Sequence, residues 1–200
     1  MTRAEKVETE IRREQIAQAA MDIVAIHGFK GLTNERVASM IGIVPSALYK
    51  HFKNKSQIID AIVELMVTRM RELIQNARKI GDNPLDCLRR VYLAHLYLVV
   101  QSPAIPMIIF SEEGAGPKGE RKAKFQAIGK LLSEELSKLF QIAIDKKLIR
   151  HDLKAESLTM FYVGMIAQAG FIMEHHKDKE LVFEHGDLAW KTFVEILHLR

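Results

Sequence analysis

Apolar and polar positions follow a helical period along most of the chain, and the first segment to do so covers residues 10–27. The apolar residues of this segment recur at helical spacing and share one face: Ile11, Ile16, Ala19, Ala20, Ile23 and Val24. The segment runs into Gly28 and Gly31, and glycine readily adopts the left-handed conformation that ends helices. We therefore predict a first helix that ends at this turn.

Two short helices are predicted next, over 34–41 and 45–51. Thr33 or Asn34 is a suitable N-cap for the first of them, because a short polar side chain can accept a hydrogen bond from the free backbone N–H groups. Gly42 then breaks the pattern. A proline opens the second short helix, where the missing N–H would have had no partner.

Both short helices have an apolar face. Leu48 and Phe52 lie four residues apart, as do Val37 and Ile41, so each pair projects from one side of its helix. Each helix can therefore bury that side against the first helix. Three helices with a tight glycine-containing turn between the second and third predict a tri-helical helix-turn-helix domain.

The rest of the chain continues the helical pattern. We predict a connector helix from Ile58 to about Ala77, followed by helices over 84–101, 104–112, 118–147, 154–175 and 180–198. No stretch has several alternating strands bounded by hairpin turns. The sequence thus predicts an all-α fold with a helix-turn-helix DNA-binding domain over residues 1–56 and a C-terminal helical ligand-binding and dimerisation domain over 57–200.

The distribution of charge adds a weak indication of a polyanionic partner. The formal net charge of the 200 residues is +4, and residues 1–55 hold nine Lys or Arg against six Asp or Glu. Residues 56–200 are almost balanced. Most of the positive excess therefore lies at the N-terminal end, where a nucleic-acid-binding module would need it.

Cysteine content and hydropathy indicate the compartment. Cys87 is the single cysteine, which excludes an intramolecular disulfide and a cysteine-based zinc cluster and fits a reducing cytoplasm. The N-terminal residues have no apolar stretch typical of a secretory signal. Residues 158–173 are the most apolar run, but they are shorter than a bilayer requires and contain Gln168, so we predict a buried helix and no membrane partner.

The third predicted helix has a polar side suited to DNA. Five of its residues lie off the Leu48/Phe52 face: Ser46, Ala47, Tyr49, Lys50 and His51. They present hydroxyl, cationic and imidazole groups on a helix thin enough for the major groove, where side chains reach base edges. Lys55, at the start of the next helix, is well placed for a backbone phosphate.

These residues carry a family resemblance. Residues 10–56 resemble the DNA-binding domain of the TetR family of repressors through the Gly28-Phe29 end of the first helix, the Leu-Thr entry to the second, and the Val-Ala and Ile-Gly-Ile core pattern. The most specific part is the run Leu-Tyr-Lys-His-Phe-Lys-Asn-Lys over residues 48–55. The resemblance covers nearly a quarter of the chain.

The resemblance implies a role for each DNA-facing residue. It implies phosphate contacts for Thr33, Asn34, Tyr49, His51 and Lys55, and positions near the bases for Ser46, Ala47 and Lys50. Glu35 departs from the family, whose members often carry a neutral or basic residue there. A carboxylate avoids phosphates, so Glu35 is not expected to contact DNA.

The last two helices are predicted to form a two-fold homodimer. The helix containing residues 158–173 is apolar nearly all round and must bury more than one face. Its small residues allow close helix approach, and the final helix adds four large apolar side chains: Leu188, Phe193, Ile196 and Leu197. The family resemblance implies the same dimer. Two recognition helices related by a two-fold axis require a pseudo-palindromic operator on double-stranded DNA.

A small-molecule site is predicted in the regulatory half. Its candidate residues are aromatic or methionine side chains of the middle helices with two polar groups to orient a ligand: Tyr92, His95, Met107, Phe110, Phe125, Phe161, Met165 and Gln168. Each of these residues would serve equally well as ordinary core. The composition favours a hydrophobic or amphipathic effector, whose binding would release the repressor from DNA.

Two alternatives remain at this stage. The glycine-rich stretch 114–119 lacks the GK[ST] ending of a P-loop, and no catalytic motif is present, so an enzyme is not predicted and neither is a cofactor. A metal-responsive regulator would use His175 and His176 with Cys87 or His185. Adjacent histidines point about 100° apart on a helix, which disfavours that interpretation.

Overall fold

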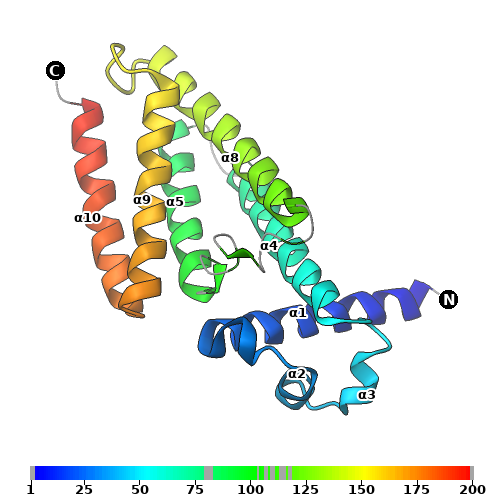
Figure 1. Ribbon diagram of the computed structural model, residues 1–200. Coiled ribbons are helices and arrows are strands. Elements are labelled where there is room, and N and C mark those ends of the chain that lie inside the picture. The colour runs from blue at the N-terminus through cyan, green and yellow to red at the C-terminus, as the bar shows by residue number, and fades with distance from the viewer. Residues whose placement is uncertain are drawn as a thin grey trace. The chain divides into compact units, whose positions relative to one another are not determined.

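A computed structural model describes residues 3–78, 83–102, 104–105, 108, 111–112, 116 and 119–198. These residues form helices and no strand, so the predicted all-α fold is confirmed (Figure 1). The helices are α1 (Arg3–Gly31), α2 (Asn34–Met40), α3 (Pro45–Leu48), α4 (Lys55–Arg78), α5 (Pro84–Gln101), α8 (Glu120–Asp145), α9 (Ala155–His175) and α10 (Lys179–His198). Of the helix predicted over 104–112, residues 106, 107, 109 and 110 lie outside the described residues.

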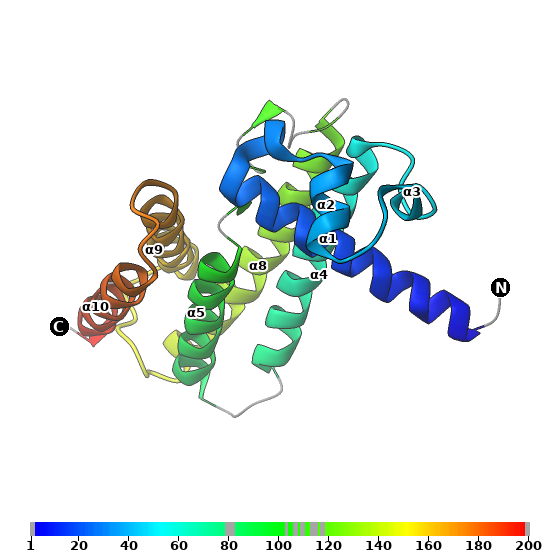
Figure 2. The same ribbon diagram turned by 90° about the horizontal axis from the view of Figure 1, so that it is seen from below.

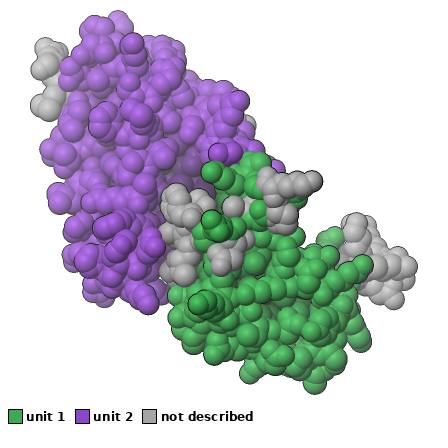
Figure 3. All heavy atoms as spheres, in the orientation of Figure 1, with its two compact units in different colours: residues 1–69, 104–125 green, residues 70–103, 126–200 purple. Residues whose placement is uncertain are grey.

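The chain divides into two compact units. Unit 1 comprises residues 1–69 and 104–125, and unit 2 comprises residues 70–103 and 126–200 (Figure 3). Helices α4 and α8 each begin in unit 1 and end in unit 2. These bounds describe packing, so the functional division between residues 56 and 57 stays a prediction.

The core of unit 1 is built from the predicted apolar faces. Helix α2 packs against α1, and α3 packs against α2 (Figure 2). Ile16, Val37, Leu48 and Phe52 are all buried in this core. Ile11 is an exception, because its side chain is 53% exposed and does not join the apolar face predicted for the first helix.

Gly28 produces a sharp break in α1 rather than its end. Its backbone has φ 65° and ψ −177°, a conformation that is nearly exclusive to glycine, and one more helical turn follows before Gly31. Phe29 is thereby turned into the core of unit 1. The first helix was predicted to end at this turn, whereas Gly28 only breaks it and the helix continues to Gly31.

The helix-turn-helix has the predicted caps and a shorter third helix. Thr33 is the N-cap of α2, where its hydroxyl oxygen accepts a hydrogen bond from the Arg36 N–H at 3.3 Å. Gly42 has φ 70° in the turn between α2 and α3. Helix α3 ends at Leu48 rather than at residue 51, and the next three residues form a turn.

Unit 2 is organised around an aromatic cluster. Helices α5, α9 and α10 pack against one another, and their aromatic rings meet with Phe140 of α8 at centroid separations of 5.3–6.3 Å. Two buried hydroxyls are satisfied by backbone carbonyls: Tyr92 donates to Gly186 and Tyr162 to Leu88, each at 3.1 Å. The cluster therefore ties all three helices together.

Helix α9 is buried on one side only. Tyr162 and Ile166 face the core of unit 2, whereas Met160, Phe161 and Phe171 are more than half exposed. The single chain therefore buries one face of this apolar helix, and the burial predicted for its other face stays a prediction that requires a partner subunit. Within the described residues, no helix is long and apolar enough to cross a membrane.

We expect opposite effects from alanine at Gly42 and Gly129. Gly42→Ala places a side chain at positive φ and should lower the free energy of unfolding by about 1 kcal/mol. Gly129 lies inside α8, and the space that an added methyl group would occupy is open, so Gly129→Ala should raise that free energy by roughly 0.5–1 kcal/mol. Urea unfolding of both variants tests the contrast, and stabilisation by Gly42→Ala would contradict it.

Candidate nucleic-acid interface

Helix α3 and the residues that follow it, through Phe52, have one buried and one exposed side. Leu48 and Phe52 are almost completely buried, which fixes the rotation of the helix about its axis. Ser46, Tyr49 and Lys50 are exposed as a result. The sequence-based expectation of a polar outer side is met for these three residues. Two further predicted residues are half-buried on the same segment: Ala47 and His51.

A side-chain hydrogen bond links the N-terminus of α2 to the end of α3. The amide nitrogen of Asn34 donates to the hydroxyl of Tyr49 over 2.8 Å, and the ring of Tyr49 is 58% exposed. Thr33 is also exposed, one residue before Asn34. Three of the predicted phosphate-contacting residues therefore lie close together on the surface of unit 1.

Arg13 holds the segment that follows α3, and the sequence analysis missed it. Its guanidinium donates to the backbone carbonyl of His51 and lies over the ring of Phe52, 4.1 Å from the centroid. Stacking of this kind adds a cation–π attraction to the hydrogen bond. Nothing in the local pattern of α1 distinguishes Arg13 from an ordinary surface arginine, because its partners lie 38 residues or more along the chain.

His51 lies in a positive environment. Burial lowers the pKa of its imidazole below the ordinary value, and the nearby charges of Arg12, Arg13 and Lys50 lower it further. Three cations therefore approach one part of the helix-turn-helix. The uncharged imidazole can still donate one hydrogen bond to a phosphate, while the surrounding cations supply the electrostatic attraction.

Lys55 stabilises two helix ends at once. It is the first residue of α4, and its ammonium donates to the backbone carbonyl of Phe29 near the end of α1. An ammonium carries three N–H donors, so this bond leaves capacity for a phosphate. The turn before Lys55 is capped as well: the Asn54 side chain accepts from the Gln57 N–H at 3.0 Å.

The described residues of the predicted small-molecule site are divided between the two units. Phe125 belongs to unit 1, whereas Tyr92, His95, Phe161, Met165 and Gln168 belong to unit 2. Phe161 and Gln168 are exposed. Met107 and Phe110 lie outside the described residues. The ligand-binding assignment therefore stays a prediction.

Two of these residues are in distinctly buried surroundings. Tyr92 is part of the aromatic cluster, and burial, together with the charge of Asp187, raises the pKa of its hydroxyl to about 12. His95 is half-buried, its Nδ1 atom is buried and has no hydrogen-bond partner among the described residues, and burial lowers its pKa to about 4. His95 is thus an uncharged polar group inside unit 2 with hydrogen-bonding capacity unused.

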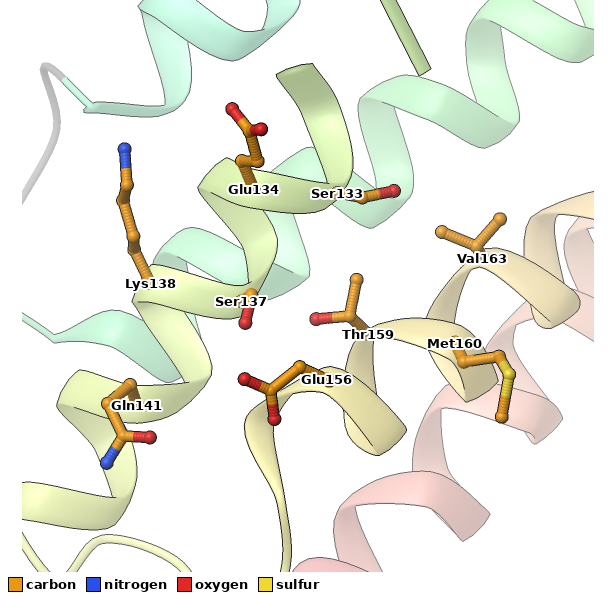
Figure 4. Close-up of a pocket in the computed structure, with 9 residues that line it drawn as sticks. All are labelled: Ser133, Glu134, Ser137, Lys138, Gln141, Glu156, Thr159, Met160 and Val163. Atoms are coloured by element: carbon orange, nitrogen blue, oxygen red, sulfur yellow. The ribbon is translucent and has the colours of Figure 1, made fainter. Parts of the chain in front are cut away.

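A surface hollow of about 650 Å³ lies between α8 and α9. Figure 4 shows Ser137 of α8 and Thr159 of α9 turned toward the space between the two helices. The remaining lining residues are Ser133, Glu134, Lys138, Gln141, Glu156, Met160 and Val163. None of the predicted ligand-binding residues that the structure describes is among them.

The histidines considered for a metal have other contacts or lie in the open. His175 is exposed, its Nδ1 is 3.0 Å from the Phe171 carbonyl, and its ring stacks on that of Phe171. Within the described ranges, no three His, Cys, Asp or Glu side chains gather as ligands for a metal ion.

Comparison with known proteins adds a family match at the helix-turn-helix. Residues 16–62 match the model of the bacterial regulatory proteins, tetR family. The chain is 40% identical to the tetracycline repressor protein class C of Escherichia coli over 58 residues, which are 29% of this chain and 26% of that protein. The family match includes every residue predicted above to face DNA, since these lie between positions 33 and 55.

Two further similarities extend over nearly the whole chain. The nucleoid occlusion factor SlmA of Shewanella sp. (strain MR-4) is 26% identical over 187 residues, which cover 90% of this chain and 91% of that protein. The structure of AibR in complex with isovaleryl coenzyme A and operator DNA superposes with a TM-score of 0.66 at 22% identity, covering 93% of this chain and 98% of that one. This last similarity shows a shared fold.

His95 should make the fold sensitive to acid. Its pKa is about 4 in the folded chain against an ordinary value of 6.5, so unfolded chains bind more protons between these values. Stability should therefore fall as the pH drops from 6.5 toward 4, by at most about 3 kcal/mol.

Urea unfolding of wild type and His95→Gln at about pH 7 and about pH 4.5 measures this contribution, with His185→Gln as an exposed control. We expect a smaller loss of stability in His95→Gln than in the other two proteins. Equal losses in all three would contradict the assignment.

Proposed function

We propose that this chain, a DNA-binding transcription regulator of the tetR family, acts as a repressor that occupies a pseudo-palindromic operator as a homodimer. The observation that carries the proposal is the two-sided character of α3 and of the residues that follow it, through Phe52. Leu48 and Phe52 are buried, while Ser46, Tyr49 and Lys50 stay exposed. Such a helix can enter the major groove without disturbing the core.

The exposed residues divide into two roles. Ser46, Ala47 and Lys50 lie toward the bases, and the lysine can bind the O6 and N7 acceptors of guanine. Phosphates would be held by the remaining predicted residues: Thr33, Asn34, Tyr49, His51 and Lys55. The Asn34–Tyr49 hydrogen bond supports this division, because it orders both side chains before DNA arrives.

Lys50→Ala should weaken binding to the preferred operator roughly 10- to 100-fold and relax the sequence preference at one base pair. Tyr49→Phe should weaken binding to all duplexes by a similar factor, because it removes a phosphate contact that carries no sequence information.

The control is Lys130→Ala, which removes an 80% exposed lysine from α8. Fluorescence anisotropy measures the affinity for the preferred operator and for scrambled duplexes at several salt concentrations. These affinities distinguish a base contact from a phosphate contact. Unchanged affinity in Lys50→Ala would count against the proposed interface.

Apolar residues on the outer sides of α9 and α10 support the homodimer. Phe161 is 67% exposed and Leu188 is 66% exposed, and five more large apolar residues of these helices are exposed: Met160, Val163, Phe171, Phe183 and Ile196. Surfaces of this kind are usually covered by a partner. Of the residues named from the sequence, Phe193 and Leu197 are buried within unit 2 and do not contribute, because the period of α10 turns them inward.

Leu188→Glu should shift the protein from dimer to monomer and reduce operator affinity, because a charge at the centre of an apolar interface is costly to desolvate. Ile26→Glu is the matched control, since Ile26 is 65% exposed but lies on α1. Sedimentation equilibrium at micromolar concentration measures the mass of each. A wild-type monomer, or an unchanged dimer in Leu188→Glu, would refute the arrangement.

A hydrophobic or amphipathic small molecule is the effector we propose for unit 2, and we place the regulator in the cytoplasm. The structural similarity to AibR supports an acyl-bearing molecule as a first candidate, because AibR was solved with isovaleryl coenzyme A and operator DNA. An effector releases DNA only if it binds the DNA-free conformation more tightly. A screen in which polar compounds alone release the operator would overturn this choice.

The similarity to SlmA supports a second candidate role, that of a nucleoid occlusion factor. In that case DNA binding would serve a process other than repression of a nearby gene. Mapping the bound chromosomal sites separates the two roles. Sites within promoters favour the repressor, and sites spread without relation to promoters favour the second role.

A further inference from the structure

Arg121 is a buried cation that links the start of α8 to the start of α4. Its side chain is only 4% exposed. The Nε atom donates to a carboxylate oxygen of Asp60 at 2.7 Å, and one terminal nitrogen donates to both the carbonyl and the hydroxyl of Ser56, at 2.8 and 2.6 Å. All these residues belong to unit 1.

The surroundings of Arg121 are shaped to accept it. A side chain at Gly116 would lie 2.9 Å from the Cγ atom of Arg121, and Gly116 has φ 74°, so both the space and the backbone there suit glycine alone. One turn along the same helices, Lys124 pairs with Glu64, but both side chains of that pair are about half exposed. Asp60 and Glu64 are similarly exposed, at 49% and 55%, so the two pairs differ in the burial of the cation and in the bonds from Arg121 to Ser56.

The part of α4 held by Arg121 is next to Lys55, the proposed phosphate contact. Ser56 directly follows Lys55, whose ammonium already holds the carbonyl of Phe29. The Ser56 carbonyl has a second lone pair available beyond its bond within the helix. The guanidinium thus fixes the backbone of the residue next to a proposed phosphate contact.

We propose that Arg121 is a positioning residue for DNA binding: it fixes the first turn of α4 and thereby the direction of Lys55. This proposal rests on the proposed function, in which Lys55 contacts a phosphate. Charged hydrogen bonds of 2.6–2.8 Å are lost after a shift of about 1 Å. Operator affinity therefore depends on where the start of α8 lies.

Because α8 is one continuous helix, it connects Arg121 in unit 1 with unit 2, where the effector is proposed to bind. Residues 120–125 of the helix belong to unit 1, and residues 126–145 belong to unit 2. An effector that favours a displaced α8 would separate Arg121 from Ser56 and Asp60. The first turn of α4 would then lose a fixed position, and the Lys55 contact would weaken.

The test compares Arg121→Met with Lys124→Met, which removes the exposed neighbouring pair as a matched control. We expect Arg121→Met to weaken operator binding about tenfold and to lower the steepness of its salt dependence by about one phosphate contact. Lys124→Met should change neither quantity by more than about twofold. Arg121→Lys, which keeps the charge without the planar fork, should fall between wild type and Arg121→Met.

A double-mutant cycle with Lys55→Met distinguishes positioning from general destabilisation. If Arg121 acts through Lys55, Arg121→Met should have little further effect on affinity once Lys55 is methionine. Independent, multiplying effects would overturn the proposal, and so would an unchanged affinity in folded Arg121→Met.

Two results need separate interpretation: an Arg121→Met variant that does not fold, and a wild-type protein that binds no duplex. If circular dichroism shows that Arg121→Met does not fold, Ser56→Ala, which removes one acceptor, takes its place with an expected loss of about threefold. Affinity equal to that of wild type in folded Ser56→Ala would then count against the proposal. Failure of wild type to bind any duplex would instead refute the proposed function itself.

Discussion

The burial of Leu48 and Phe52 is the constraint on which the rest of the molecule depends. Helix α3 has only four residues, far fewer than an isolated helix needs for stability in water. Its orientation is therefore set by what it packs against, and these two side chains decide which residues face outward. Arg13 adds to this anchor by bonding the His51 carbonyl and covering the Phe52 ring.

The sequence predicted the helices and the helix-turn-helix because these follow from local periodicity. The residues that hold the helix-turn-helix in place were beyond such reasoning. Arg13 and His51 are 38 positions apart, and Arg121 and Asp60 are 61 apart, so neither pairing leaves a periodic trace. Gly28 was visible as a break, but its φ/ψ values decide that one more turn follows.

The roles of residues in unit 2 were harder to predict, because the same residue types fill a hydrophobic core and line a ligand cavity. Tyr92 was predicted to bind a ligand, yet its hydroxyl bonds Gly186 and its ring joins the aromatic cluster of unit 2. On α10, Leu188 and Phe193 both suit an interface by composition. Only the phase of the helix exposes the first and buries the second.

The surface proposed to face DNA is held largely by side chains that bond backbone carbonyls. Arg13 bonds His51, Lys55 bonds Phe29, and Arg121 bonds Ser56. Apolar contacts weaken gradually with distance, whereas hydrogen bonds to charged groups are lost over about an ångström. A surface fixed in this way keeps its geometry while these hydrogen bonds are intact and loses it after a small displacement of either partner. That combination suits a regulator that must bind DNA tightly in one conformation and release it in another.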